Sequence, residues 1–394
     1  MEIKPIVIGD MQPSLSFVNI EKGVVQTDIW RELQQGMWRA FSVENHLHNN
    51  SVGEVDQNKW LPIFPNYKVI NPGFCWDADT KTIVADLYKP NIQQNATLNT
   101  FLSAAERYFS RFAGKKIGVH LSGGLDSSLI IALLKHFRIP FVAIGLCSYR
   151  FEFRTERVIQ QIMSEYADDA LLLDMDNYPF YSNLDKKPKH QIPDANIKML
   201  DASFALAQEF RDRGCEVVFS GQGGDTLLAE SMRNIGTFDG YNIGNEFTFP
   251  WEQDFVYCPM GIELHSFFSD KEVIDQITSL RMGKNEDPLK MWARDFFASL
   301  LPNELSKFTY CADFFGHSMD SLHQAKPSFK MLFEEAYDYL QHPLFSPKGI
   351  KQILDTDILT LEYKTYCDFC SKLSIAVWIH SLFRDDSRDN FCTR

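Results

Sequence analysis

Two short stretches rich in serine and glycine have the residue types needed to hold a phosphate group. The first runs from Ser122 to Ser127 with the sequence Ser-Gly-Gly-Leu-Asp-Ser, between a β-prone run and an apolar run of helical length. Adjacent glycines let the backbone turn tightly with no Cβ in the way of a phosphate. The amides and dipole of the helix that follows favour an anion at the same point. This stretch therefore predicts a phosphate-binding turn.

The second stretch runs from Ser220 to Asp225, with the sequence Ser-Gly-Gln-Gly-Gly-Asp. Like Asp126 in the first stretch, Asp225 follows glycines at the end of a β-prone run. A carboxylate beside a polyphosphate is repelled unless a cation lies between them, and Mg²⁺ prefers oxygen ligands. We expect the two acids to share one such metal ion.

Alternating strand and helix patterns surround both stretches and predict an α/β fold, a doubly wound parallel sheet with a helical C-terminal part. Parallel strands end at one edge of their sheet, where such folds bind ligands. Strands are expected at 116–121, 140–146, 170–174 and 216–220, and helices at 101–112, 128–135, 155–166, 199–213, 271–280, 288–301, 327–341 and 358–383.

Residues 1–95 differ from the rest and predict a small β-rich N-terminal domain, which leaves 96–394 as the main domain. Short β-prone runs at 16–20 and 82–87 alternate with turn signals. Four tryptophans are candidates for the core of this domain: Trp30, Trp38, Trp60 and Trp76.

The composition narrows the class of protein. The 394 residues carry a formal net charge of −13, which argues against nucleic acid and anionic membranes as partners. We see neither a signal-peptide pattern nor an apolar run of about 18 residues that would span a bilayer. The eight cysteines are scattered, which favours free thiols and a cytoplasmic location.

The two motifs together resemble those of a known family. The first lacks the lysine of the G-x-x-x-x-G-K-[ST] loop and is similar to the S-G-G-x-D-S signature of the PP-loop ATP pyrophosphatases. Followed by the second, it resembles asparagine synthetases and their relatives, the β-lactam synthetases and lasso peptide cyclases, which carry S-G-E-G-[AS]-D-E-x-F. Looser similarities lie at 60–73, 267–270, 290–294, 301–305 and 374–383.

The resemblance implies an adenine nucleotide α-hydrolase-like domain that uses ATP and Mg²⁺. Such enzymes adenylate a carboxylate, release pyrophosphate and let an amine form an amide. The implied catalytic and metal-binding acids are Asp126 and Asp225. The implied nucleotide-binding residues are Leu121, Ser122, Gly123, Gly124, Asp126, Ser127, Ser128, Ile144, Gly145, Leu146, Ser220, Gly221, Gln222 and Gly223, with adenine near 144–146.

The chain departs from the family at several positions. Glu2 stands where asparagine synthetases have the N-terminal cysteine that releases ammonia from glutamine, so 1–95 is interpreted as a remnant of that glutaminase domain. Gln222 and Thr226 replace the two glutamates of the second motif. The family lysine that stabilises transition-state charge falls by count near 310–311, and Lys307 is the nearest candidate.

These features favour an ATP-dependent amide ligase without its own glutaminase, with formation of a peptide macrolactam or a related natural-product amide as the preferred version. Its partners would be a carboxylate, an amine and, in some versions, a leader peptide or amine-donor protein. The alternatives are asparagine synthesis from ammonia or a partner glutaminase, thiolation of tRNA or a sulfur carrier, and a non-catalytic ATP-binding scaffold.

Four weaker signals have two interpretations each. Cys367 and Cys370 form a C-x-x-C pair, suited to sulfur transfer or simply to core packing. Glu156 and Arg157 are either substrate-side charges or ordinary charges at a helix start. Pro193-Asp194 resembles a family loop or is a solvated turn, and His120 is a core histidine rather than a base.

Overall fold

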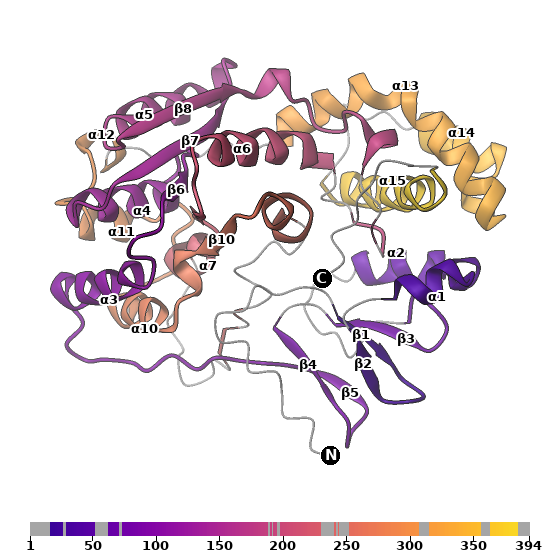
Figure 1. The fold of residues 1–394 in the computed structure, drawn as a ribbon, viewed down its shortest axis with the longest axis horizontal. Coiled ribbons are helices and arrows are strands. Elements are labelled where there is room, and N and C mark those ends of the chain that lie inside the picture. Colours follow the sequence, from indigo (N-terminus) through magenta and orange to yellow (C-terminus); the bar gives the residue numbers. More distant parts are fainter. Residues whose placement is uncertain are drawn as a thin grey trace.

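The largest sheet of the described structure is five-stranded and parallel, and it lies at the upper left of Figure 1. The computed structural model describes residues 16–26, 29–51, 62–70, 73–187, 190, 192–194, 198–229, 240–241, 243, 252–306, 315–355 and 363–384. In spatial order the strands are β10 (Glu263–Ser266), β9 (Val217–Ser220), β6 (Ile117–His120), β7 (Phe141–Cys147) and β8 (Asp169–Asp174). Every neighbouring pair is parallel, so the α/β doubly wound class is confirmed.

Both faces of the sheet are buried, as an all-parallel sheet requires. Along β7, Val142 and Ile144 pack on the side of α6, whereas Phe141 and Ala143 pack on the side of α4 and α5. Helices α3 and α10 extend this second layer (Figure 1). The bounds are α3 Leu98–Ser110, α4 Leu125–His136, α5 Arg154–Ser164, α6 Leu200–Asp212 and α10 Lys271–Arg281.

The four expected strands all form, within one residue of their predicted bounds. The structure adds β10, a strand that the sequence pattern did not indicate. Its four residues, Glu-Leu-His-Ser, have only one aliphatic side chain, and only pairing with β9 makes the strand evident.

The C-terminal part is helical as expected, with different bounds. Helix α11 (Met291–Phe296) is shorter than predicted, whereas α13 (Phe315–Leu340) begins a full three turns before Pro327, where we expected its start. Proline favours the first turn of a helix, but Pro327 lies inside α13 and the helix continues through it. Helices α12 (Asn303–Ser306), α14 (Pro347–Asp355) and α15 (Tyr363–Phe383) complete this part; 356–362 lie outside the described residues.

The N-terminal region contains two small antiparallel sheets and two short helices. Strands β1 (Ser16–Asn19), β2 (Val24–Gln26) and β3 (Tyr67–Ile70) form one sheet, and β4 (Phe74–Asp77) and β5 (Thr82–Ala85) the other. Helices α1 (Trp30–Gln34) and α2 (Val43–Ser51) lie beside the C-terminal helices (Figure 1).

The tryptophans of this region do not form one core. The Trp38 ring meets Tyr339 and Phe383, and Trp30 packs into the same large cluster, which contains helices α13 to α15. Trp76 packs instead in a small cluster with Val18 and Ile70, and Trp60 lies outside the described residues. Most of the described buried residues of this region therefore belong to the cluster that includes the C-terminal helices, and the boundary at 95/96 stays a prediction.

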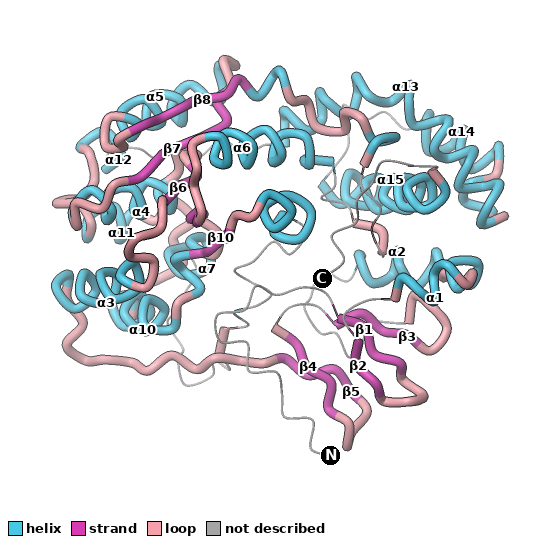
Figure 2. Tube along the Cα trace, in the orientation of Figure 1, coloured by secondary structure: helices cyan, strands magenta, loops and turns pink. Residues whose placement is uncertain are grey.

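The connection from β5 to α3 is a long loop fastened along α10 (Figure 2). Asp275 accepts hydrogen bonds from the Tyr88 hydroxyl at 2.7 Å and the Asn91 amide at 2.8 Å, and Ser279 accepts one from the Gln93 amide at 2.9 Å. The backbones of Tyr88 and Tyr241 also pair. These contacts fix the path of the loop. In the part of the chain that the structure describes, none of the helices is both long and apolar enough to cross a membrane.

Candidate active site

The first serine–glycine stretch forms the turn between β6 and α4. Gly123 has a φ of +82°, and a Cβ there would lie 2.5 Å from the Glu156 carbonyl oxygen, so only glycine fits. The Ser122 and Ser127 hydroxyls lie 2.8 Å apart, and the Gly124 amide donates to the Ser122 Oγ at 3.3 Å. The result is a tight turn with serine hydroxyls and helix amides at one point, as predicted.

The second stretch connects β9 to α7 (Gly224–Ala229) and packs directly on the first. A Cβ at Gly224 would lie 2.3 Å from Asp126 Cγ, and a Cβ at Gly221 would lie 3.0 Å from the Ser127 amide nitrogen. The glycines therefore do more than bend the chain. They allow the two loops to touch at the carboxyl edge of adjacent strands.

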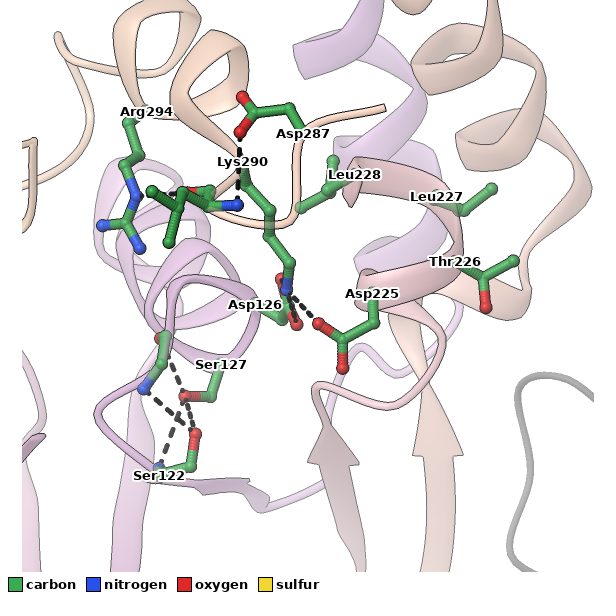
Figure 3. Close-up of polar contacts among 12 residues, drawn as sticks. Ser122, Asp126, Ser127, Asp225, Thr226, Leu227, Leu228, Asp287, Lys290 and Arg294 are labelled. Carbon is green, nitrogen blue, oxygen red and sulfur yellow. Dashed lines mark hydrogen bonds and ion pairs between the residues drawn. The ribbon is translucent and has the colours of Figure 1, made fainter. Parts of the chain in front are cut away.

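The two predicted acids meet at this junction, together with a lysine that bridges them (Figure 3). The Lys290 Nζ donates to both oxygens of Asp126, at 2.7 and 2.6 Å, and lies 2.5 Å from Asp225 Oδ1. The Asp126 and Lys290 side chains are 15% and 9% exposed, whereas the Asp225 side chain is 90% exposed. One carboxylate is thus enclosed and the other opens to solvent.

The electrostatics of this cluster keep the lysine charged. Burial acts to lower the pKa of Lys290, but attraction by Asp126 and Asp225 outweighs it and raises the pKa above its ordinary value. Arg294, from helix α11 that begins directly after Lys290, adds positive charge near Asp126. With a divalent cation added, this cluster of two carboxylates and one ammonium becomes net positive and can offset part of the negative charge of a polyphosphate.

The donor set fits magnesium. This ion commonly takes one or two protein carboxylates and completes its shell with water and substrate phosphates. Asp126 and Asp225 contact the same Nζ atom, so a single cation can contact both. Serine hydroxyls and the N-terminal turn of α4 lie on the loop that carries Asp126 and suit the phosphates.

Several predicted nucleotide-binding residues have buried side chains, so they would contact a nucleotide through backbone atoms. Leu121, Ser128 and Ile144 are fully buried. Ser220 is buried as well, while Gly145 and Leu146 are set in the β7 strand beside the first loop. Gln160, which the sequence did not single out, donates to the carbonyls of Leu121 at 2.9 Å and Leu146 at 2.6 Å. This buried amide ties the end of β7 to the phosphate turn.

Gln222, which replaces the first glutamate of the second motif, lies beside another acid, Glu252. Its side-chain amide donates to Glu252 Oε2 at 3.4 Å, and the Ser203 hydroxyl donates to the other carboxylate oxygen at 3.2 Å. Burial raises the pKa of Glu252 to about 7, against the opposite effect of Ser203. An acid from another segment therefore lies beside position 222, and no sequence motif could have indicated it.

Thr226, the second substitution, points away from the two acids (Figure 3). Its carbonyl and that of Leu227 accept hydrogen bonds from Arg281, a fully buried side chain whose guanidinium also lies over the Trp292 ring. Arg281 thus fastens α7, the helix that carries Asp225.

The remaining candidate catalytic residues are Lys307 and the cysteine pair Cys367 and Cys370. Lys307 lies outside the described residues, as do 310 and 311. Burial raises the pKa of the Cys370 thiol, which contacts the Tyr181 hydroxyl at 3.2 Å in the core. This environment disfavours the thiolate that sulfur transfer needs and fits the core-packing interpretation of Cys367 and Cys370.

The residues of the other weak signals lie in different places. Arg157 donates to the Ser148 carbonyl at 2.8 Å, and Glu156 is buried beside Gly123. Asp194 lines a small cavity with Lys198. Burial lowers the pKa of His120 to about 4, and its ring stacks on Phe210, as expected of a core histidine.

Fold and site together define an α/β domain of the PP-loop type, with the ligand edge built from two glycine loops. Residues 110–233 match the family model described as asparagine synthase. This part of the chain is therefore similar to asparagine synthases, and the match includes both loops and both acids. No curated protein matches the chain. Members of this family use ATP, generally with Mg²⁺. The match therefore supports an ATP-dependent amide-forming ligase of the general kind.

Proposed function

We propose that the chain adenylates a carboxylate with ATP, releases pyrophosphate and transfers the acyl group to an amine, and that the product is a peptide macrolactam or a related natural-product amide. The observation that carries this proposal is the convergence of Asp126, Asp225 and Lys290 at the junction of the two glycine loops. The substrates are a carboxylate and an amine, with a leader peptide or an amine-donor protein as a further partner.

The chemistry requires one bond to form and one to break at each step. A substrate carboxylate oxygen attacks the α-phosphorus of ATP, and the bond to the oxygen bridging the α and β phosphates breaks, so that pyrophosphate leaves with the electron pair. The amine nitrogen then attacks the acyl carbon, AMP leaves, and the amine loses a proton. Mg²⁺ held by Asp126 and Asp225 would offset the charge that develops on the pyrophosphate.

Lys290 and the serine turn bind the remaining negatively charged phosphate oxygens in the first step. An ammonium donates to several phosphate oxygens as a point charge, and the N-terminal turn of α4 directs its amides toward an anion. Gln160 holds the first loop and the end of β7 at fixed separation, which positions the adenine and phosphate ends of one nucleotide.

For the second step, Glu252 is the proposed acceptor of the amine proton. Its pKa of about 7 suits proton transfer near neutral pH, and Gln222 holds one of its oxygens.

Ammonia from glutamine within this part of the chain is disfavoured. The first cysteine, Cys75, lies inside β4, where burial raises the pKa of its thiol. Six free cysteines among the described residues also suit a reducing, cytoplasmic location.

The test is pyrophosphate release from Mg²⁺–ATP, and exchange of labelled pyrophosphate into ATP, with candidate peptides and amino acids offered in turn. Asp126→Asn and Asp225→Asn are compared with Asp295→Asn, a control on the exposed face of α11. We expect exchange with one carboxylate class in the wild type and the control, and its loss in both site variants.

Macrocyclisation is then read by mass spectrometry as loss of one water from a linear peptide. Pyrophosphate release that persists in both site variants would refute the assigned site. Tight ATP binding with no pyrophosphate release for any carboxylate would instead favour a non-catalytic scaffold.

A further inference from the structure

Lys290 occupies the oxygens that a metal ion would need. Its Nζ contacts Asp126 Oδ1, Asp126 Oδ2 and Asp225 Oδ1 at 2.7, 2.6 and 2.5 Å. An ammonium has three hydrogens, and these three contacts use all of them. The lysine is therefore the cation that holds two acids from different loops together.

The backbone of Lys290 is shaped for this contact. Its φ is +54°, a left-handed conformation that non-glycine residues rarely adopt and that persists only where the surroundings impose it. Asp287 imposes it here: its carbonyl accepts from the Lys290 amide at 2.8 Å, and its carboxylate accepts from the Met291 amide at 2.5 Å. From this position at the start of α11 the side chain extends to the acids (Figure 3).

An ammonium and a magnesium ion exclude each other from these oxygens. Magnesium binds oxygen at about 2.0–2.1 Å in near-octahedral geometry, so a metal shared by the two acids would lie in contact with the Nζ atom. The two positive charges would then repel each other. One cation must leave when the other arrives. A polyphosphate provides the alternative partner, because its oxygens accept hydrogen bonds from an ammonium as well as carboxylates do.

We propose that Lys290 and the divalent metal ion compete for Asp126 and Asp225, so that the metal enters this site only with a polyphosphate that draws the lysine away. Lys290 is thereby a positioning residue that holds the two carboxylates in place before the metal arrives. This inference rests on the proposed nucleotide site but not on turnover.

The experiment measures Mn²⁺ binding to the full chain without nucleotide, by electron paramagnetic resonance of the free ion. The Lys290→Met variant frees both carboxylates and should bind Mn²⁺ about 10- to 100-fold more tightly than the wild type, since a charge-assisted hydrogen bond no longer opposes the metal. Lys290→Arg keeps a cation beside the acids and should bind Mn²⁺ as weakly as the wild type. Adding Asp225→Asn to Lys290→Met should remove the gain.

Equal Mn²⁺ affinity in the wild type and Lys290→Met, whether strong or weak, would overturn the proposal. Tight binding of Mn²⁺ by the nucleotide-free wild type that Asp126→Asn abolishes would overturn it too, and this arm needs no Lys290 variant to fold. Lys290→Gln serves in place of Lys290→Met if circular dichroism shows that the latter is unfolded. Because no ATP is present, the result is independent of whether the chain releases pyrophosphate.

Discussion

Replacing Glu252 with glutamine should make the stability of the protein less dependent on pH. The acid is 8% exposed, and burial raises its pKa from 4.5 to about 7. Raising the native pKa means that the native state binds a proton more tightly than the unfolded chain does. Stability from this group is therefore complete below pH 4.5 and is lost as the pH rises toward 7.

The magnitude follows from the size of the shift. About 2.5 units at 1.36 kcal/mol each give a loss of ~3 kcal/mol between pH 4.5 and 7. Glutamine does not titrate and preserves the shape of the side chain, and its carbonyl oxygen can still accept from Ser203. Glu252→Gln should therefore gain stability relative to the wild type as the pH rises, by up to ~3 kcal/mol above pH 7.

The assay is thermal unfolding of both proteins at several values between about pH 4.5 and 8.5, which spans the titration of the acid. The difference in Tm between variant and wild type cancels the titration of all other groups, and it should grow by several degrees across this window. Glu286→Gln, at an exposed position, is the control and should show no such growth. A Tm difference that stays constant with pH would show that Glu252 is not buried as the structure has it.

Two further substitutions test how the site is held. In Gly224→Ala the new Cβ would lie 2.3 Å from Asp126 Cγ, so we expect pyrophosphate release to fall at least about tenfold, as misplacing a catalytic group does, and the Tm to fall because the site is overpacked. A fully active variant would show that the loops do not need their contact. In Gln160→Leu the carbonyls of Leu121 and Leu146 lose their donor, which should cost about 1–3 kcal/mol of stability and weaken ATP binding in calorimetry; unchanged affinity would exclude Gln160 as a positioning residue.

The sequence was sufficient for those features that depend on local pattern. Four strands and their helices follow from hydrophobic runs, and the two phosphate turns follow from glycines beside acids. Parallel strands 117–120 and 217–220 end at one edge, so the strand pattern and the position of each acid after its strand are enough to predict that Asp126 and Asp225 meet.

What the sequence did not indicate depends on contacts between distant segments. Lys290 was visible only as part of a loose similarity, and its contact with Asp126 spans 164 positions. The four-residue strand β10 needs β9 to exist, and the tryptophans of the N-terminal region pack partly against helices at the other end of the chain. Such pairings are set by tertiary packing and leave no periodic signal.

Gln222 illustrates how a substitution that suggests lost function can have the opposite meaning. A glutamate at this position would lie 3.4 Å from a buried carboxylate, and two like charges so close cannot both stay ionised. The neutral amide instead donates a hydrogen bond to Glu252 and helps to hold this buried acid in place. Gln222 and Glu252 therefore depend on each other, since the amide at the motif position donates to an acid from a different segment of the chain. If Glu252 accepts the amine proton as proposed, the substitution at 222 is compatible with catalysis, and Gln222→Glu should lower the rate of amide formation by placing a second carboxylate beside Glu252.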